Sequence, residues 1–207
     1  MKRILILILL LSSTVLLRAQ TTQDSTLTLY RGYVGGMMVH LGYGSGGILT
    51  PTGSSQTIEV KGVSSGIGGK IAVLLGDHFR AGAEGYVSTI KYGDNRKASL
   101  GWGGLSGDYG WIWDKWRLYF GVTIGAGGYE NMASLDSPLN NNTPQETVWN
   151  SYNVFIIDPY IEINFSLTKK ILLCAKVDWI TSPSANNSSF KDYSTGPRLY
   201  LGFMFAK

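Results

Sequence analysis

The sequence predicts an all-β protein, an eight-stranded antiparallel up-and-down transmembrane β-barrel. Three observations predict it: an N-terminal segment typical of exported proteins, eight later segments that alternate apolar and polar residues, and connections that are alternately short and long. Alternation with a period of two is the mark of a strand whose two faces meet different surroundings. A parallel α/β fold would need helical crossovers, and no segment has the 3.6-residue period of such helices.

The composition of the 207 residues narrows the class of protein. Charged residues make up 15% of the chain, against roughly 25% in soluble domains. Glycine is frequent, with 27 residues, but has no three-residue period, which excludes a collagen-like chain. The 12 Tyr, 7 Phe and 6 Trp supply ample apolar surface for a packed fold. A single Cys excludes a disulfide framework and a four-thiolate zinc site.

Residues 1–19 read as a secretory signal peptide. A basic Met-Lys-Arg start precedes an apolar run over 4–11, and Ala19 offers a small residue for cleavage. The run is shorter than the roughly 20 residues that a spanning helix needs. The predicted organisation is therefore a signal peptide over 1–19 and one barrel domain over 20–207. Loss of the signal brings Lys and Arg close to balance with Asp and Glu, so no basic surface for nucleic acid is expected.

Eight segments carry the strand pattern, and the clearest runs from Val154 to Leu167. The pattern is weakest over 99–113, where Trp102 and Leu105 would share a face only if a β-bulge lay between them. The predicted strands lie near residues 29–43, 64–75, 79–92, 99–113, 116–128, 154–167, 171–179 and 198–205.

The connections between these segments alternate in length. Short turns lie at 76–78, 114–115 and 168–169, and longer connections rich in Ser, Asn, Gly and Pro lie at 44–63, 93–98, 130–152 and 182–195. This alternation is typical of up-and-down barrels in the bacterial outer membrane, which have their short turns in the periplasm.

The two faces of the strands predict which side contacts lipid. One face carries the large aliphatic residues, whereas the other carries charge, Gly and Tyr. A soluble lipocalin-like barrel is the alternative, but its exterior would be rich in Lys and Glu rather than in Gly. Aromatic residues also gather near strand ends, as in the girdles at membrane interfaces. These residues are Phe79, Trp111, Trp113 and Trp116 at the short-turn end, and Tyr43, Tyr129 and Trp179 at the other.

The polar face predicts an interior ion-pair network with five cations and five anions, because an unpaired buried charge is costly. Its predicted members are Lys70, Arg80, Arg117, Lys176 and Arg198, with Glu84, Asp108, Asp158, Glu162 and Asp178. Centring two hairpins on their short turns places Lys70 opposite Glu84, and Glu162 opposite Lys176, close enough for ion pairs. An eight-stranded barrel holds side chains in its interior and hardly a channel.

With these features the chain resembles the small eight-stranded outer-membrane barrels of Gram-negative bacteria, of the OmpA/OmpX kind, over all of 20–207. The aromatic C-terminal strand Leu199–Phe205 adds to the resemblance, although Ala206 and Lys207 follow it. The resemblance implies recognition of this strand by the barrel-insertion machinery and contact with outer-membrane lipid and lipopolysaccharide. It implies no peptidoglycan-binding domain, and the loop style and the Gln at the cleavage site suggest a Bacteroidetes-like source.

Few residues in the sequence are candidates for a catalytic role. Some small barrels are acyltransferases or deacylases of lipopolysaccharide, and His40, which points inward, is the one candidate base for such an enzyme. A hydrogen-bonded interior histidine is the interpretation we favour, with His78 solvated in a turn and Cys174 a buried filler. Asp158 and Glu162 lie roughly 13 Å apart along one strand, too far for a glycosidase pair. No catalytic residue, cofactor or metal site is therefore predicted.

The sequence thus favours an exported, monomeric outer-membrane protein that is not an enzyme. Its expected role is structural, or surface interaction through the long loops, of which 130–152 is the leading candidate. The alternatives are a lipid-modifying barrel enzyme that uses His40, and a soluble lipid-binding barrel of the lipocalin kind.

Overall fold

The computed structural model describes residues 30–49, 58–92, 96–135, 146–181 and 196–207. The predicted signal peptide and the connections around 140 and 190 lie outside the described residues. The eight strands are β1 (Tyr30–Leu49), β2 (Ile58–Leu75), β3 (Phe79–Lys91), β4 (Lys97–Trp113), β5 (Trp116–Leu135), β6 (Glu146–Ser166), β7 (Ile171–Ile180) and β8 (Gly196–Ala206).

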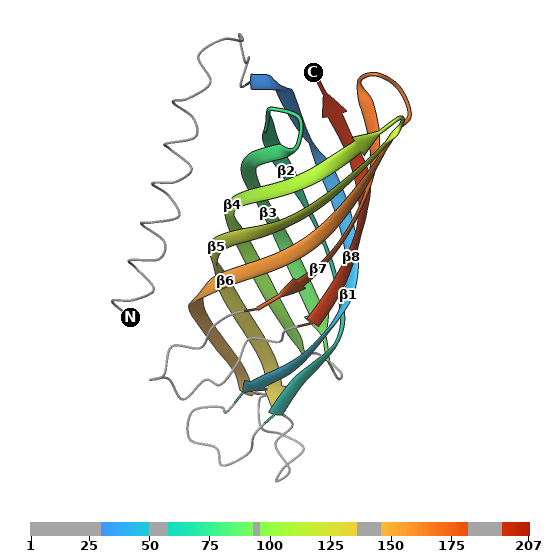
Figure 1. Ribbon diagram of the computed structural model, residues 1–207. Helices are drawn as coiled ribbons and strands as arrows, with labels where there is room; N and C mark the ends of the chain where they lie inside the picture. The colour runs from blue at the N-terminus through green and yellow to red at the C-terminus, as the bar shows by residue number, and fades with distance from the viewer. Residues whose placement is uncertain (1–29, 50–57, 93–95, 136–145, 182–195) are drawn as a thin grey trace, which may run out of the picture.

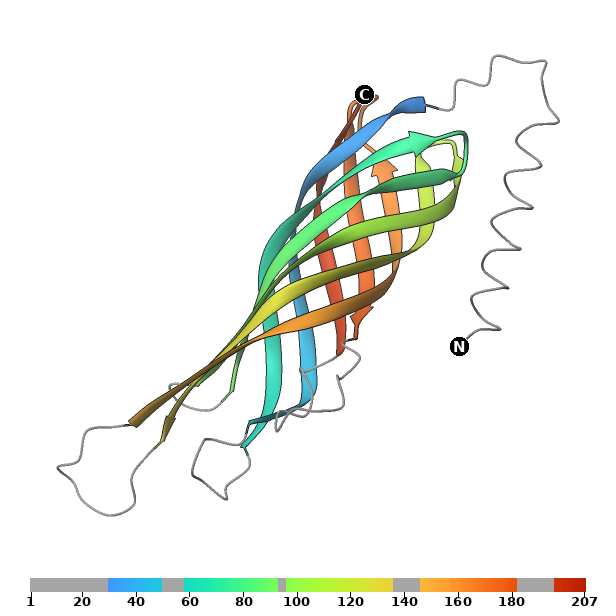
Figure 2. The ribbon, with the colours of Figure 1, turned by 90° about the vertical axis from the view of Figure 1, so that its left-hand side faces the viewer.

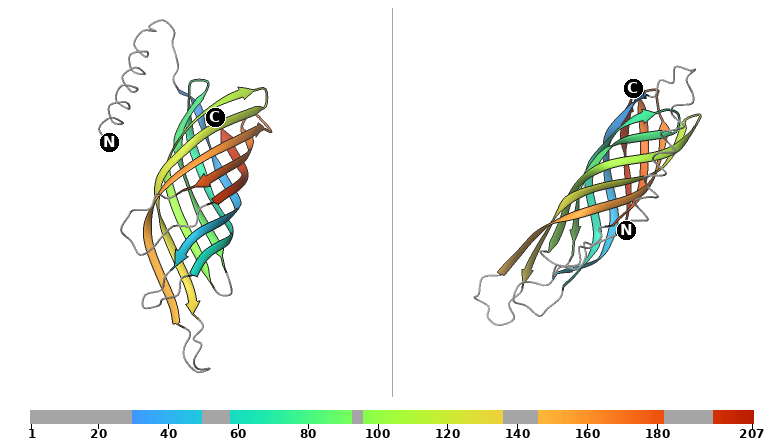
Figure 3. Two further views of the ribbon diagram at one scale, coloured as in Figure 1. Left: turned by 60° about the horizontal axis from the view of Figure 1, so that its bottom comes forward. Right: turned by 60° about the vertical axis from the view of Figure 1, so that its left-hand side comes forward.

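The strands form one closed barrel in which each pairs antiparallel with its sequence neighbours and β1 pairs with β8. The predicted fold class is thereby confirmed, and Figures 1 and 3 show the strands strongly tilted around the ring. The short turns lie at one end, here called the turn end, and the opposite end is called the loop end. Within the described residues, no helix has the length and apolar character to cross a membrane.

Four strands are longer at the loop end than the sequence pattern indicates. β1 runs on to Leu49, β2 begins at Ile58, β5 runs on to Leu135, and β6 begins at Glu146, so the predicted loops 44–63 and 130–152 are partly strand. Polar residues interrupt the alternation in these parts of β5 and β6, and glycines interrupt it in β1. Hydrogen bonding to a neighbouring strand does not depend on that alternation, so the strands continue. No β-bulge separates Trp102 from Leu105 in β4, because its pairing with β3 and β5 is continuous, so the two residues lie on opposite faces. Trp102 is 5% exposed inside the barrel and Leu105 is 75% exposed outside it.

β5 and β6 form an arm that extends beyond β7 and β8, with β4 paired to β5 as far as Met132. Their ladder runs from Trp116 opposite Phe165 to Leu135 opposite Glu146, whereas β6 pairs with β7 only from Tyr160 to Ser166, with a further bridge at Ile157. Figure 2 shows the two strands running well past the ends of β7 and β8. The scaffold therefore presents a β-hairpin at the loop end.

The aliphatic face is the outside of the barrel. Exposed aliphatic side chains occur on β1, β2, β3, β4, β5, β6, β7 and β8, whereas the charged residues of the polar face lie inside. This is the reverse of a lipocalin, whose apolar face lines a cavity. Most of the predicted girdle is exposed as well, at Phe79, Trp111, Trp113 and Trp116 and at Tyr43 and Trp179. Tyr129 differs, because it lies inside the barrel and is 3% exposed.

Large interior side chains lie directly opposite glycines, which accounts for much of the glycine in the chain. A Cβ on Gly68 would lie 2.1 Å from the Tyr86 ring, and a Cβ on Gly121 would lie 2.5 Å from the Tyr160 ring. Each ring is the cross-strand partner of its glycine. The same relation joins Tyr119 to Gly110 and Trp102 to Gly127. In each of these pairs the bulky interior side chain occupies space that a Cβ on the neighbouring strand would need.

Candidate functional site

The barrel interior holds two groups of buried charges. The first, here called the turn-side cluster, consists of Lys70, Arg80, Asp108 and Glu162. Arg80 binds the Asp108 carboxylate with two hydrogen bonds of 2.7 and 2.9 Å, and its Nη2 lies 2.8 Å from Glu162 Oε1. Lys70 Nζ lies 2.8 Å from Asp108 and 3.0 Å from Glu162. Two cations and two carboxylates thus satisfy one another in a closed ring.

The second group, the loop-side cluster, consists of Glu84, Asp158, Lys176, Asp178 and Arg198. Lys176 Nζ lies 2.9 Å from Glu84, 3.4 Å from Asp158 and 3.8 Å from Asp178. Arg198 donates two hydrogen bonds of 2.9 Å to Asp178 and lies 3.3 Å from Asp158. This cluster has three carboxylates for two cations, and Asp158 is the carboxylate that has no contact with a cation shorter than 3.3 Å.

Tyr160 lies between the two clusters. Its hydroxyl accepts a hydrogen bond of 2.8 Å from Lys70 and donates one of 2.7 Å to Asp108. The ammonium groups of Lys70 and Lys176 lie 4.3 and 4.4 Å from the ring centroid, within the range of cation–π attraction. Residues from β2, β4 and β7 therefore contact one ring of β6 in the middle of the barrel.

Nine of the ten predicted network residues lie in these clusters, and Arg117 is the exception. It is half-buried at the turn end, where its cross-strand partner is Asn164, and no ion pair joins it to another described residue. The predicted balance of five against five is therefore replaced by four cations and five carboxylates in the clusters.

The predicted register is observed, but the predicted ion-pair partners are wrong. Lys70 stands opposite Glu84, and Glu162 opposite Lys176. The charges nevertheless exchange partners across the lumen, so that Lys70 binds Glu162 and Lys176 binds Glu84. Long side chains in a narrow barrel reach the opposite wall as easily as the next strand, and pairing rules for flat sheets do not include that option.

His40 is buried, and its Nε2 lies 3.0 Å from Ser88 Oγ. Its ring packs on Tyr200, with ring centroids 4.8 Å apart. This pair of a base and a hydroxyl is the arrangement that suggests acyl chemistry among the residues considered above, and it is buried inside the barrel rather than on its outer surface. Such a hydrogen bond is also what an interior histidine needs.

Cys174 and His78 are the other two residues that the sequence analysis considered, and both make packing contacts or hydrogen bonds within the barrel. Cys174 is buried, with its Sγ 3.5 Å from Met38 Sδ. The exposed His78 side chain also contacts the protein: its Nδ1 lies 2.8 Å from the Gly110 carbonyl oxygen, and its ring packs on Tyr109. Within the described part of the chain, no group of three His, Cys, Asp or Glu residues could hold a metal ion.

Several interior residues were not singled out by the sequence. Tyr160, Thr123, Asn164 and Tyr119 all contact the clusters: Thr123 donates to Glu84, Asn164 donates to Glu162 over 2.8 Å, and the Arg80 guanidinium lies 3.4 Å from the Tyr119 ring centroid. Their positions share the parity of the charged residues along β5 and β6. That parity marks the four residues as interior positions in the sequence, whereas the predicted network contained charged residues only.

The fold matches solved structures of outer-membrane barrels. Neisserial surface protein A is 15% identical, with a TM-score of 0.56 over 84% of this chain and 96% of that one. The outer membrane protein OprG from Pseudomonas aeruginosa is 10% identical, with a TM-score of 0.54 over 85% and 95%. At these identities the likeness shows the fold. No family model and no curated protein matches the chain.

Proposed function

We propose that the protein is an integral outer-membrane barrel without a large pore, whose role is structural or lies in interactions at the cell surface. One observation carries the proposal: a wall with aliphatic residues outside encloses an interior filled by ion pairs. Such a wall is stable only where lipid covers it, because exposed aliphatic area on this scale drives association in water. The filled interior leaves little room for solutes.

The arm of β5 and β6 supports a role at the surface. It projects at the loop end (Figure 2) and carries exposed polar residues such as Glu130, Ser151 and Asn153. Rigid scaffolds commonly present their recognition surfaces on such extensions. We place the loop end outside the cell and the short turns in the periplasm, as in other barrels of this architecture.

Cysteine labelling in a Gram-negative host would test location and orientation together. Ser137→Cys, in the connection between β5 and β6, should react with a membrane-impermeant maleimide on intact cells. Thr168→Cys, in the turn between β6 and β7, should react only after the outer membrane is permeabilised. Cys174 is buried and serves as the unlabelled background. Labelling of both variants without permeabilisation, or recovery of the chain in the soluble periplasm, would overturn the proposal.

Gel mobility and conductance would test the closed barrel. The detergent-extracted protein should migrate differently before and after boiling, because a closed barrel resists unfolding by the detergent. In planar bilayers it should give no stable conductance steps of the size seen with porins. Such steps in the folded protein would contradict the absence of a large pore.

An enzymatic role is the weaker candidate, and the hydrogen bond between His40 and Ser88 is what favours it. Both side chains are buried inside the barrel, so an acyl chain would have to enter the lumen to reach them. Release of fatty acid from lipopolysaccharide by the wild type, and its loss in a folded His40→Ala variant, would establish this alternative.

A further inference from the structure

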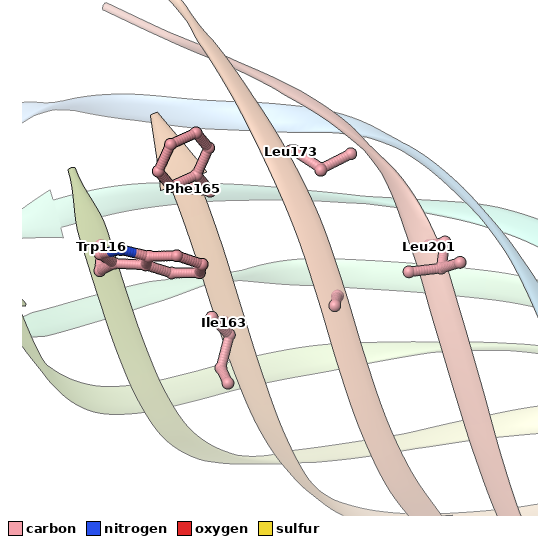
Figure 4. Close-up of a pocket in the computed structure, with 6 residues that line it drawn as sticks. Trp116, Ile163, Phe165, Leu173 and Leu201 are labelled. Atoms are coloured by element: carbon pink, nitrogen blue, oxygen red, sulfur yellow. The ribbon is translucent and has the colours of Figure 1, made fainter. Parts of the chain in front are cut away.

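An apolar groove lies on the outer wall near the turn end, with a volume of about 200 Å³. Its lining residues are Trp116, Ile163, Phe165, Leu173, Ala175 and Leu201. Ala175 forms the floor, because it stands between Ile163 on β6 and Leu201 on β8. Trp116 and Phe165 pack with ring centroids 4.7 Å apart and close one side (Figure 4). A small residue among large ones thus leaves a furrow on the lipid-facing surface.

Three exposed lysines lie at the end of this groove. Lys115 immediately precedes Trp116, and Lys169 and Lys170 occupy the turn between β6 and β7. The two turns are neighbours, because the Ser166 amide donates a 2.8 Å hydrogen bond to the Lys115 carbonyl oxygen. Asp114 is the single carboxylate in these turns, and no ion pair joins the three lysines to other described residues. The groove therefore ends beneath a local excess of positive charge.

We propose that this groove binds one anionic phospholipid from the periplasmic leaflet. An acyl chain would lie over Ala175, between Ile163 and Leu201, and the phosphate would contact the lysines of the two turns. Apolar burial and charge pairing then act on the same molecule. The inference rests on the proposed orientation in the outer membrane, which places the turn end at the phospholipid leaflet.

A second copy of the chain is a poorer occupant. Two barrels in one membrane that met groove to groove would be related by an axis along the membrane normal, because both have the same orientation. Their turns would then lie at the same depth, and the lysines of one copy would approach those of the other. Like charges at such a distance disfavour the contact, whereas a phosphate would relieve the excess charge of each copy.

Native mass spectrometry of the detergent-solubilised protein would test the site. The probes are phosphatidylglycerol and phosphatidylethanolamine with identical acyl chains, each titrated into delipidated protein. Ala175→Phe fills the groove, and the triple variant K115Q/K169Q/K170Q removes the charge. Ala83→Phe, a small residue facing outward on β3, is the control for the first. K61Q/K91Q/K97Q, three exposed lysines towards the loop end, is the control for the second.

The wild type should retain one phosphatidylglycerol, with an affinity about tenfold above that for phosphatidylethanolamine. Ala175→Phe should lose both lipids, the lysine triple variant should lose only the preference, and the two controls should match the wild type. Equal binding by wild type and Ala175→Phe, equal loss in Ala83→Phe, or a dimer abolished by Ala175→Phe would overturn the proposal. Heat-modifiable mobility of every variant shows that the barrel is intact, so failure of this site is distinguishable from failure of the proposed barrel.

Discussion

The two charged clusters inside the barrel differ in balance and in fit. In the turn-side cluster two cations meet two carboxylates, and every ion-pair contact lies between 2.7 and 3.0 Å. In the loop-side cluster two cations meet three carboxylates, and contacts extend to 3.8 Å. Buried charges contribute stability only when each has a close opposite partner. We therefore expect the turn-side cluster to hold the barrel together and the loop-side cluster to tolerate change.

The largest effect is expected for Asp108→Asn in the turn-side cluster. Its carboxylate binds Arg80, Lys70 and Tyr160, and its neutralisation leaves two buried cations to share Glu162. Breaking such a buried pair should lower the free energy of unfolding by about 3–5 kcal/mol. Urea unfolding in lipid vesicles, followed by the change in gel mobility, would measure the loss. A loss below about 1 kcal/mol would show that the short contacts do not carry the stability.

A smaller effect is expected for Gly121→Ala, which tests the space around the same cluster. A Cβ there would lie 2.5 Å from the Tyr160 ring and 2.6 Å from Asp108 Cβ, so both residues must shift. Overpacking of this kind should cost about 1–3 kcal/mol in the same unfolding measurement. Gly128→Ala on the same strand is the matched control, because nothing lies within 4 Å of its Cβ position. Equal losses for both variants would point to strand flexibility rather than to the cluster.

Asp158→Asn should change stability by at most about 1 kcal/mol. This residue belongs to the acidic surplus of the loop-side cluster, and its contacts with Lys176 and Arg198 are 3.4 and 3.3 Å. An amide keeps the shape and removes the surplus charge. The comparison with Asp108→Asn, under identical unfolding conditions, is the direct test of the difference between the clusters. Losses of similar size for the two substitutions would remove that difference.

The smallest effect is expected for Arg117→Gln, which should leave the free energy of unfolding within about 0.5 kcal/mol of the wild type. Arg117 is half-buried at the turn end and takes no part in the clusters. A loss comparable to that of Asp108→Asn would instead place Arg117 within the network in the folded protein.

The sequence predicted most of the barrel but less of its interior. Alternation in β6, β7 and β8 identified both faces, because lipid and lumen impose opposite demands on successive residues. It missed the loop-end parts of β1, β2, β5 and β6, which are also strand. The predicted register correctly placed Lys70 opposite Glu84. The ion-pair partners of these residues could not be predicted from the register, because their side chains cross the lumen. Tyr129 is an aromatic residue near a strand end, as a girdle residue would be, but its place in the alternation of β5 is that of an inward-facing residue. It lies inside the barrel.

The ion pairs of the interior also constrain how the chain can enter a membrane. Lys70 and Glu162 are 92 positions apart, as are Glu84 and Lys176. The hairpins of the first half therefore carry charges whose partners belong to the last three strands. A sheet without those strands would leave Glu84 without Lys176 and would leave Lys70 and Arg80 to share Asp108, which is unfavourable in apolar surroundings. We therefore expect closure of the barrel to be cooperative, because the arrival of β6 and β7 supplies the missing partners Glu162 and Lys176 together.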